Sequence, residues 1–432
     1  MKDFFKKVVT LSLQLEARAV LRKYAPQVVA ITGSVGKTAT KDAIFSVIAK
    51  IAHTRKSEKS FNSEVGLPLT ILGRPNAWSN PLKWFENIFD GLFLIFIRTR
   101  YPKWLVLEVG ADRPGDITQV VKWLPVDIAV ITRLPEVPVH VEFFDSPEEV
   151  VEEKASLIKA LTKEGVLVLY GDDARTRSLA RRAEGRRVVT FGFGEENNVR
   201  ARGVEIVFEE GEHPRPLGIR AELTVHTESA PIEVVGTVGE HALLPLLAGA
   251  AVGHALNMEF PQILEALKSY EPPHGRMHLL PGIKQTTIID DTYNSSPAAV
   301  VAALDALAAV GNKRKVAILG DMLELGRYSA AEHKKVGAYA AEHADLLVTV
   351  GFRARDIAEG ALNNSMEEGK VLQYEDARRA GAELQNILEE GDTILIKGSQ
   401  SMRMERTVKE VMLEPERAKK LLVRQDVEWQ RR

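Results

Sequence analysis

The residues from Thr32 to Thr38, which read T-G-S-V-G-K-T, have the types and spacing of a phosphate-binding loop. They follow the apolar run Val28–Thr32 and precede a helical pattern. Glycines let backbone N–H groups point at phosphate oxygens, and the lysine and threonine would neutralise phosphate charge and bind Mg²⁺. With Gly33 as its first glycine, the loop is two residues shorter than the full G-x-x-x-x-G-K-[ST] pattern. The chemistry indicated is binding of a nucleoside triphosphate by Gly33, Ser34, Val35, Gly36, Lys37 and Thr38.

Three more side chains stand where they could serve the same chemistry. Glu108 ends the apolar run L-V-L-E, and a carboxylate at the carboxyl end of a strand can hold Mg²⁺ directly or through water. His140 follows the run I-A-V-I-T, where a histidine either binds a second metal, orients phosphate, or is an ordinary surface or core residue. Lys154 has Val150 and Ile158 four residues away on either side. Its local sequence therefore indicates only a solvated helix lysine without an acidic partner at that spacing.

Polar clusters follow apolar runs at three places in the last third of the chain. They lie at 290–297 (D-D-T-Y-N-S-S-P), 320–326 (G-D-M-L-E-L-G) and 397–402 (K-G-S-Q-S-M). Ligands of open α/β sheets bind outside the carboxyl ends of the strands. Each cluster alone is weak evidence for a site, and three of them in one segment support one another.

The elements that must position these residues form an α/β pattern. Short apolar runs alternate with helical stretches from residue 28 onward, which favours a parallel sheet covered on both faces. The alternating residues of 197–237 indicate an antiparallel insert or edge, and helices follow from about 240 to 270. We expect strands at Val28–Thr32, Trp104–Val109, Ile128–Thr132, Gly165–Tyr170, Val188–Phe191, Thr286–Asp290, Val316–Leu319, Leu346–Val350 and Thr393–Ile396.

The chain divides into three segments around a linker at Pro272-Pro273-His274-Gly275. Residues 1–26 are expected to form an amphipathic helix, 27–271 a central ATP-binding domain, and 272–432 a second α/β domain. The composition, 45% hydrophobic and 27% charged, is that of a soluble globular protein. A net charge of −2 gives no electrostatic case for nucleic acid as a partner.

The absence of cysteine excludes disulfides, thiolate metal sites and a cysteine nucleophile. No secretory signal is apparent, so we expect a cytoplasmic protein. The segment 82–101 departs from the average, because its apolar core is interrupted by Asp90 and is too short to span a bilayer, which needs about 20 residues. It is either a buried helix or oligomer contact, or an interfacial helix that places the protein at the membrane periphery.

These motifs, in this order, resemble the Mur ligase family over about residues 28–412. Within the family they are most similar to the branch that adds D-alanyl-D-alanine to a UDP-linked muramyl tripeptide. The segments that carry the resemblance are ITGSVGKT, KSFNSEVGLPLTIL, LVLEVGADRPGDI, the His140 loop, EEKASLIKAL, HGRM, IIDDTYNSSP, ILGDMLELG and IKGSQSMRME. The resemblance implies a P-loop ATPase domain with a mostly parallel sheet, followed by a Rossmann-like α/β domain. It also implies ATP-dependent amide-bond formation for the cell wall, through an acyl phosphate.

The resemblance also implies a role for each matching residue. Lys37, Glu108, His140 and Lys154 would be catalytic, with Lys154 at the position that family members carbamylate. Mg²⁺ would be held by Thr38, Glu108 and His140. From the second domain, ATP would be contacted by Arg276, Asp291 and Asn294. The peptide precursor and the amino acid or dipeptide would be contacted by Asn62, Ser63, Glu64, Asp321, Lys397 and Ser399.

Three departures from the family bear on the substrate. About 25 residues of expected helix stand where the family has its UDP-sugar domain, so UDP recognition is open, and segment 82–101 would dock a lipid, a membrane or a partner instead. The family's His-Asn-x-x-Asn helix start reads His241-Ala242-Leu243-Leu244-Pro245, which removes an adenine contact. Arg133 and Gln400 replace the usual asparagine and arginine. The Arg133 cation would lie near the metals and the acceptor, where it would either bind a substrate carboxylate or mark altered specificity.

Two other functions compete with this assignment. One is a Mur-like ligase acting on another acid, such as a folate, an amino-acid polymer or a precursor without UDP. The other is a nucleotide-binding scaffold without catalysis, against which the retained catalytic residues argue.

Overall fold

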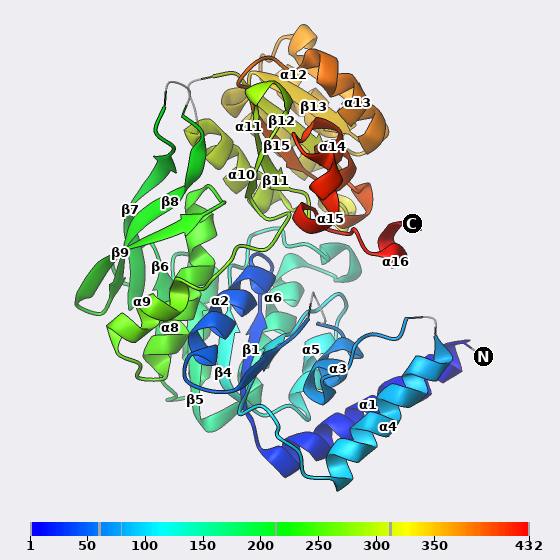
Figure 1. The fold of residues 1–432 in the computed structure, drawn as a ribbon, viewed down its shortest axis with the longest axis vertical. Helices are drawn as coiled ribbons and strands as arrows, with labels where there is room; N and C mark the ends of the chain where they lie inside the picture. The colour runs from blue at the N-terminus through cyan, green and yellow to red at the C-terminus, as the bar shows by residue number, and fades with distance from the viewer. Residues whose placement is uncertain (1, 59–61, 79, 212–213, 311–312, 431–432) are drawn as a thin grey trace.

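The computed structural model describes residues 2–58, 62–78, 80–211, 214–310 and 313–430. It is an α/β protein with two mixed, mostly parallel sheets, one on either side of the 272–275 linker (Figure 1). The first sheet has the order β2-β3-β1-β4-β5-β6-β7-β8-β9. Its strands are β1 (Gln27–Thr32), β2 (Thr54–Lys56), β3 (Trp104–Glu108), β4 (Val126–Ile131), β5 (Leu161–Tyr170), β6 (Val188–Gly192), β7 (Val199–Phe208), β8 (Pro216–Val225) and β9 (Glu228–Val235).

Helices cover both faces of the first sheet, as its continuous apolar strands require. One face packs against α2 (Lys37–Ala49), α8 (Leu244–Ala255) and α9 (Phe260–Leu267). The other face packs against α1 (Lys2–Tyr24), α3 (Gly66–Leu72), α5 (Asp116–Val121) and α6 (Pro147–Ala155), while α7 (Ala174–Ser178) follows β5. The short helix α6 begins sharply because Ser146 accepts a hydrogen bond from the Glu149 amide and Pro147 occupies its first turn.

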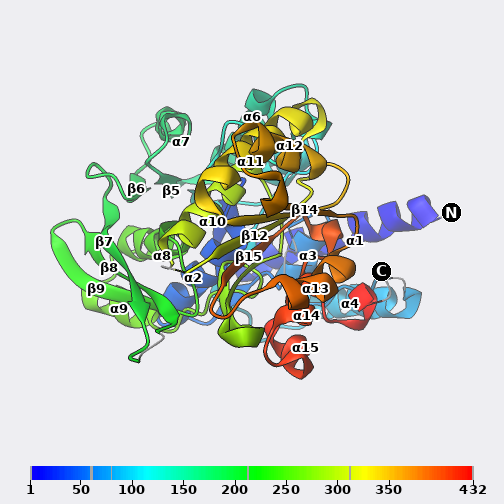
Figure 2. The same ribbon diagram turned by 90° about the horizontal axis from the view of Figure 1, so that it is seen from above.

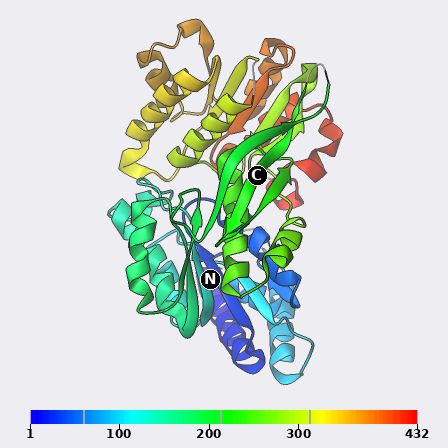
Figure 3. The ribbon, with the colours of Figure 1, turned by 90° about the vertical axis from the view of Figure 1, so that its left-hand side faces the viewer.

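The second sheet has the order β10-β11-β15-β12-β13-β14, parallel except for the antiparallel pair β10–β11. Helices again cover both faces, as Figure 3 shows from the side. The strands are β10 (His278–Pro281), β11 (Thr287–Asp291), β12 (Lys315–Gly320), β13 (Leu346–Val350), β14 (Val371–Tyr374) and β15 (Thr393–Lys397). The helices are α10 (Pro297–Ala309), α11 (Ser329–His343), α12 (Arg355–Asn363), α13 (Ala377–Ile387), α14 (Glu405–Val411), α15 (Ala418–Leu421) and α16 (Val427–Gln430).

All nine predicted strands are present within one or two residues of their expected starts, except that β5 begins at Leu161. The segment 197–237 forms the antiparallel edge β7-β8-β9, as expected. Sequence reasoning missed β2, β10 and β14, which have only three or four residues each. Such short edge strands carry too few residues to show a period.

Of the alternatives predicted for 82–101, the buried helix is wrong. The segment forms α4 (Pro81–Phe96), whose first turn is capped by Asn80. Only Asn87 and Gly91 of this helix are buried, while Phe89 and Phe96 are 71% and 78% exposed. Helix α4 packs beside α1, and the pair projects from the first domain (Figures 1 and 2). Among the residues described, no helix is long and apolar enough to cross a membrane.

Candidate active site

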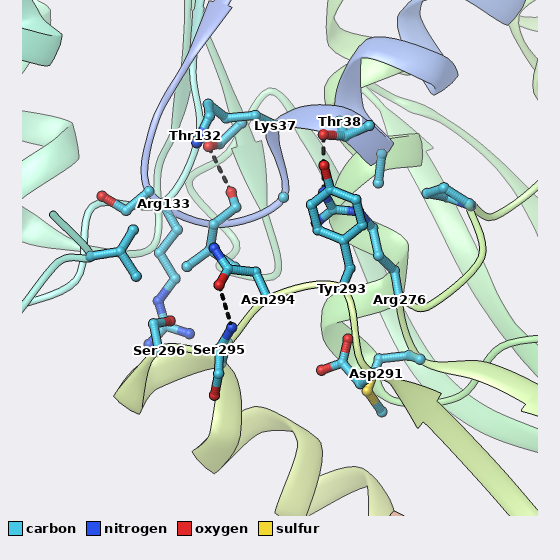
Figure 4. A pocket seen from close by; sticks show the side chains of 18 of the residues that line it. Lys37, Thr38, Thr132, Arg133, Arg276, Asp291, Tyr293, Asn294, Ser295 and Ser296 are labelled. Atoms are coloured by element: carbon cyan, nitrogen blue, oxygen red, sulfur yellow. Dashed lines mark hydrogen bonds between the residues drawn. The ribbon is translucent and has the colours of Figure 1, made fainter. Parts of the chain in front are cut away.

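A cavity of about 740 Å³ lies between the two domains and is lined by residues of both (Figure 4). The first domain contributes the phosphate loop and the ends of β3 and β4. The second contributes the loops after β11, β12 and β15. These are the strand-end clusters expected from sequence, and the volume is typical of a small-molecule site.

The phosphate loop runs from the end of β1 into the start of α2. Gly36 has φ +83° and stands directly before α2, while Gly33 has φ +142° and packs against Thr132. A Cβ at Gly33 would lie 2.0 Å from Thr132 Oγ1, so this close approach requires glycine. Lys37 Nζ donates to the Gly33 carbonyl at 3.1 Å. Burial lowers the pKa of Lys37; the nearby Glu108 carboxylate opposes this shift and the Arg276 charge adds to it.

Thr38 and Glu108 meet because β1 and β3 are neighbouring parallel strands. Thr38 Oγ1 donates to Glu108 Oε2 at 2.9 Å, and Asn62 Nδ2 donates to Glu108 Oε1 at 3.3 Å. Arg276 reaches across from the second domain and donates from Nη2 to Thr38 Oγ1 at 3.0 Å. The two domains therefore meet at a threonine hydroxyl that sits beside a buried carboxylate.

Lys154 on α6 is 1% exposed, although its local sequence indicated a solvated lysine. No hydrogen bond or ion pair joins its Nζ to another residue in the described part of the chain. Burial and the Lys37 charge lower the pKa of Lys154 to about 7, and Asp112 and Glu153 partly offset this. A large fraction of this amine is therefore neutral near pH 7, which a solvated lysine amine is not.

His140 has φ +70° and faces two acids. Its Nδ1 lies 2.7 Å from Glu324 Oε2 of the second domain, and its Nε2 lies 3.6 Å from Asp112 Oδ1. The His140 contact lowers the pKa of Glu324. Next to this pair, the Glu142 amide donates to the Glu324 carbonyl at 3.3 Å. The described residues contain no group of three or more His, Asp or Glu side chains arranged to hold a metal.

The second domain presents a buried ion pair to the cavity. Lys397 Nζ lies 2.5 Å from Asp291 Oδ2 and donates to the Asn294 carbonyl at 2.9 Å. Arg276 stacks over the Tyr293 ring with its guanidinium carbon 4.1 Å from the ring centre. Ser399 Oγ accepts from the Leu323 amide at 2.8 Å, which ties together the loops after β12 and β15.

Some of the residues predicted to contact substrate lie outside the cavity lining, and others lie within it. Ser63 and Glu64 are exposed in the turn that precedes α3 and do not line the cavity, although Asn62 does. Asp321 is buried outside the cavity lining, where it accepts from the Ala354 amide. Arg133 lines the cavity and extends toward Ser296 (Figure 4).

Sequence reasoning did not single out several lining residues. Asp112 and Glu324 lay inside quoted motifs and could have been chosen as acids next to strand ends. Nothing in the local sequence signals Trp429, which comes from the C-terminal segment. The lining residues not singled out include Asp112, Tyr170, Phe191, Tyr293, Glu324, Arg403 and Trp429.

A phosphate loop and a buried acid at a cavity between two α/β domains, with a buried lysine on α6 of the first domain, are the parts of an ATP-dependent ligase that forms amide bonds. Comparison with known proteins supports this class. A model of the Mur ligase middle domain matches residues 91–253, and a model of the Mur ligase glutamate ligase domain matches residues 275–400. The chain belongs to the Mur ligase family.

Two known ligases that are similar to this chain come from one branch of the family. The UDP-N-acetylmuramoyl-tripeptide–D-alanyl-D-alanine ligase of Bacillus subtilis is 30% identical over 406 residues, which cover 94% of this chain and 80% of that protein. MurF ligase from Thermotoga maritima, solved in complex with ADP, is 26% identical with a TM-score of 0.75, covering 93% of this chain and 83% of that one. Its bound ADP and the family membership support ATP binding by this chain.

A more distant structure shares the fold alone. Folylpolyglutamate synthase from Mycobacterium tuberculosis, complexed with ADP and AMPPCP, has a TM-score of 0.63 at 16% identity. The alignment covers 90% of this chain and 93% of that one. This fold is therefore shared with an enzyme of a different name, and the fold alone does not identify the substrate.

Proposed function

We propose that this protein joins D-alanyl-D-alanine to a muramyl peptide, using ATP to activate the peptide's carboxylate as an acyl phosphate. The observation that carries the proposal is the gathering of two half-sites around one cavity. Lys37 and Glu108 come from the first domain, and Arg276 and Lys397 come from the second. The similarity to D-alanyl-D-alanine-adding ligases supports the choice of substrates.

The chemistry first transfers the γ-phosphoryl group of ATP to a carboxylate oxygen. It then replaces the C–O bond of the acyl phosphate with a C–N bond. A carboxylate oxygen attacks the γ-phosphorus of ATP and ADP leaves. The amine then attacks the acyl carbon, loses a proton and displaces phosphate. Lys37 and the loop amides would stabilise charge on the transferring phosphoryl group. Arg276, which already reaches Thr38, would add a second cation when the domains close on ATP.

The residues present fit an Mg²⁺ ion. Thr38 and Glu108 place a hydroxyl and a carboxylate 2.9 Å apart beside the phosphate loop, and Mg²⁺ commonly takes one or two protein oxygens and fills its octahedron with water and phosphate oxygens. When bound, the ion would neutralise phosphate charge. His140 instead contacts Glu324 and Asp112, so its proposed role as a ligand would require these contacts to change.

A carbamate on Lys154 is part of the proposal. Carbon dioxide reacts with a neutral amine, and the pKa of about 7 keeps much of this amine neutral at physiological pH. The product would be an anion close to the Lys37 cation, which now opposes a charge on Lys154. Carbamylation would thus replace a repulsive pair of cations with an attractive ion pair.

A substrate panel tests this function. Muramyl tripeptides with and without UDP, and folate as an unrelated acid, would be offered with ATP and D-alanyl-D-alanine or single amino acids, and products would be identified by mass. We expect product only from muramyl peptides with D-alanyl-D-alanine, and none from Lys37→Ala. Product from another acid alone would favour the other ligase function, and product from Lys37→Ala at the wild-type rate would reject the proposed site.

A further inference from the structure

Helix α4 presents an apolar surface that the ligase site does not use. Its outward side chains recur at helical spacing, and each is between 41% and 78% exposed. We call this surface the α4 apolar face; its members are Leu82, Phe85, Phe89, Leu92, Phe93 and Phe96. Contiguous exposed apolar patches on a folded protein mark interaction sites.

The helix is firmly held, so this exposure is not that of a frayed segment. Asn87 Nδ2 donates to the Pro75 carbonyl at 2.9 Å, and Arg74 pairs with Asp90 at 2.8 Å. Gly91 lets α1 approach closely, since a Cβ there would lie 2.0 Å from Glu16 Oε2. Because these contacts occupy the inner side of α4, the apolar face points away from α1. The pair projects beyond the domain in two views (Figures 1 and 2).

The charges around this face are basic. Residues 7–24 and 81–100 contain seven Lys or Arg and three Asp or Glu, a net of +4 in a chain whose net charge is −2. Of the acids, Glu16 is buried and Asp90 is paired with Arg74. Exposed cations stand at both ends of α4, and no ion pair joins them to another described residue: Lys83, Arg98 and Arg100.

This distribution argues against a second copy of the chain as the occupant. A symmetric dimer brings the same surface of each copy together. An antiparallel pairing would place Lys83 against Arg98 and Arg100, and a parallel pairing would place each cation against itself. Like charges at a dry contact oppose association. An anionic surface, by contrast, would attract these cations.

We propose that the α4 apolar face docks on an anionic lipid bilayer, with the helix lying in the plane of the interface. Phenylalanine and leucine would enter the boundary between headgroups and acyl chains, and the flanking cations would contact lipid phosphates. Trp78, 43% exposed, lies next to this helix through a hydrogen bond from Trp84 Nε1 to its carbonyl. Indoles favour the same interfacial layer.

Vesicle flotation with the full chain tests the proposal. We would compare phosphatidylcholine vesicles with and without phosphatidylglycerol, at low and high salt. The double variant Phe89→Glu/Phe96→Glu changes two side chains already exposed to solvent, so the fold should persist. Phe352→Glu, 77% exposed in the second domain, is the matched control. We expect binding to anionic vesicles that falls with salt, an affinity loss of at least about tenfold in the double variant, and no change in the control.

Other outcomes would overturn it. Equal binding to neutral vesicles would reject the anionic surface. Absence of vesicle binding would reject the lipid, and a dimer in light scattering that the double variant abolishes would assign the face to a second copy instead. Flotation does not depend on ligation, so a chain that binds vesicles but joins no substrates would leave this inference intact and reject only the proposed function.

Discussion

His140 and Glu324 face one another across the domain boundary, with Nδ1 and Oε2 2.7 Å apart. Their side chains are 18% and 43% exposed, so the pair is partly screened by solvent. It sits beside backbone contacts between the same two loops, where Arg327 also donates to the Asp145 carbonyl at 2.9 Å. The pair therefore belongs to the contacts that join the two domains.

Replacing Glu324 tests whether this pair assists closure. Glu324→Gln keeps the shape and removes the charge. Because a partly exposed contact of this kind contributes up to about 1 kcal/mol, we expect kcat/KM for ligation to fall by at most about fivefold and the free energy of unfolding by no more than about 1 kcal/mol. Steady-state kinetics would measure kcat/KM, and Glu368→Gln, which changes an exposed acid elsewhere, is the control. A loss of several hundredfold would show that Glu324 acts directly on substrate.

Carbamylation of Lys154 should depend on pH in a set direction. Burial lowers the pKa of this amine to about 7, so the neutral form that reacts with carbon dioxide increases as pH rises through about 7. We expect labelled bicarbonate to enter the protein more at about pH 8 than at about pH 6. Lys154→Gln should abolish incorporation, while Lys159→Gln, an exposed lysine nearby, should leave it unchanged. Label that persists in Lys154→Gln would place the carbamate elsewhere.

Gly33 should be irreplaceable for a reason beyond its positive φ. Gly33→Ala would force its Cβ to 2.0 Å from Thr132 Oγ1, which now bonds the Val35 carbonyl at 2.7 Å. Gly185 also has positive φ, +85°, but its Cβ position is open. We expect Gly185→Ala to lower the free energy of unfolding by about 1–2 kcal/mol without changing ADP affinity. Gly33→Ala should lower both the free energy of unfolding, measured by urea unfolding, and the affinity for ADP, measured by calorimetry. An unchanged affinity for ADP would contradict the assignment of this loop as the phosphate-binding loop.

Much of the first half-site could be predicted because parallel strands end at one edge. Lys37, Thr38 and Glu108 follow neighbouring strands, so the sheet alone brings them together. The buried state of Lys154 could not be predicted from its i±4 neighbours, since its neighbours in space come from other elements. The contact between His140 and Glu324 could not be predicted either, because it depends on how the two domains meet.

The same limit applies to α4. The spacing of its apolar residues is visible in the sequence, and it predicts either a buried helix or oligomer contact, or an interfacial helix. The helical spacing of apolar residues shows that a helix has an apolar face, but it does not show whether another element covers that face. Phe89 and Phe96 are exposed because α1 packs against the opposite side of α4, and only the three-dimensional arrangement shows this.

Lys397 should be a large contributor to the stability of the second domain. Its ammonium and the Asp291 carboxylate are 2% and 12% exposed and 2.5 Å apart, whereas Lys334 and Glu359 form a pair that is 43% and 52% exposed. Lys397→Met would leave a buried carboxylate without its cation, so we expect the free energy of unfolding to fall by about 3–5 kcal/mol. Lys334→Met should change it by less than about 1 kcal/mol. Urea unfolding of both variants gives the comparison, and equal effects would show that water reaches the Asp291 carboxylate when Lys397 is removed.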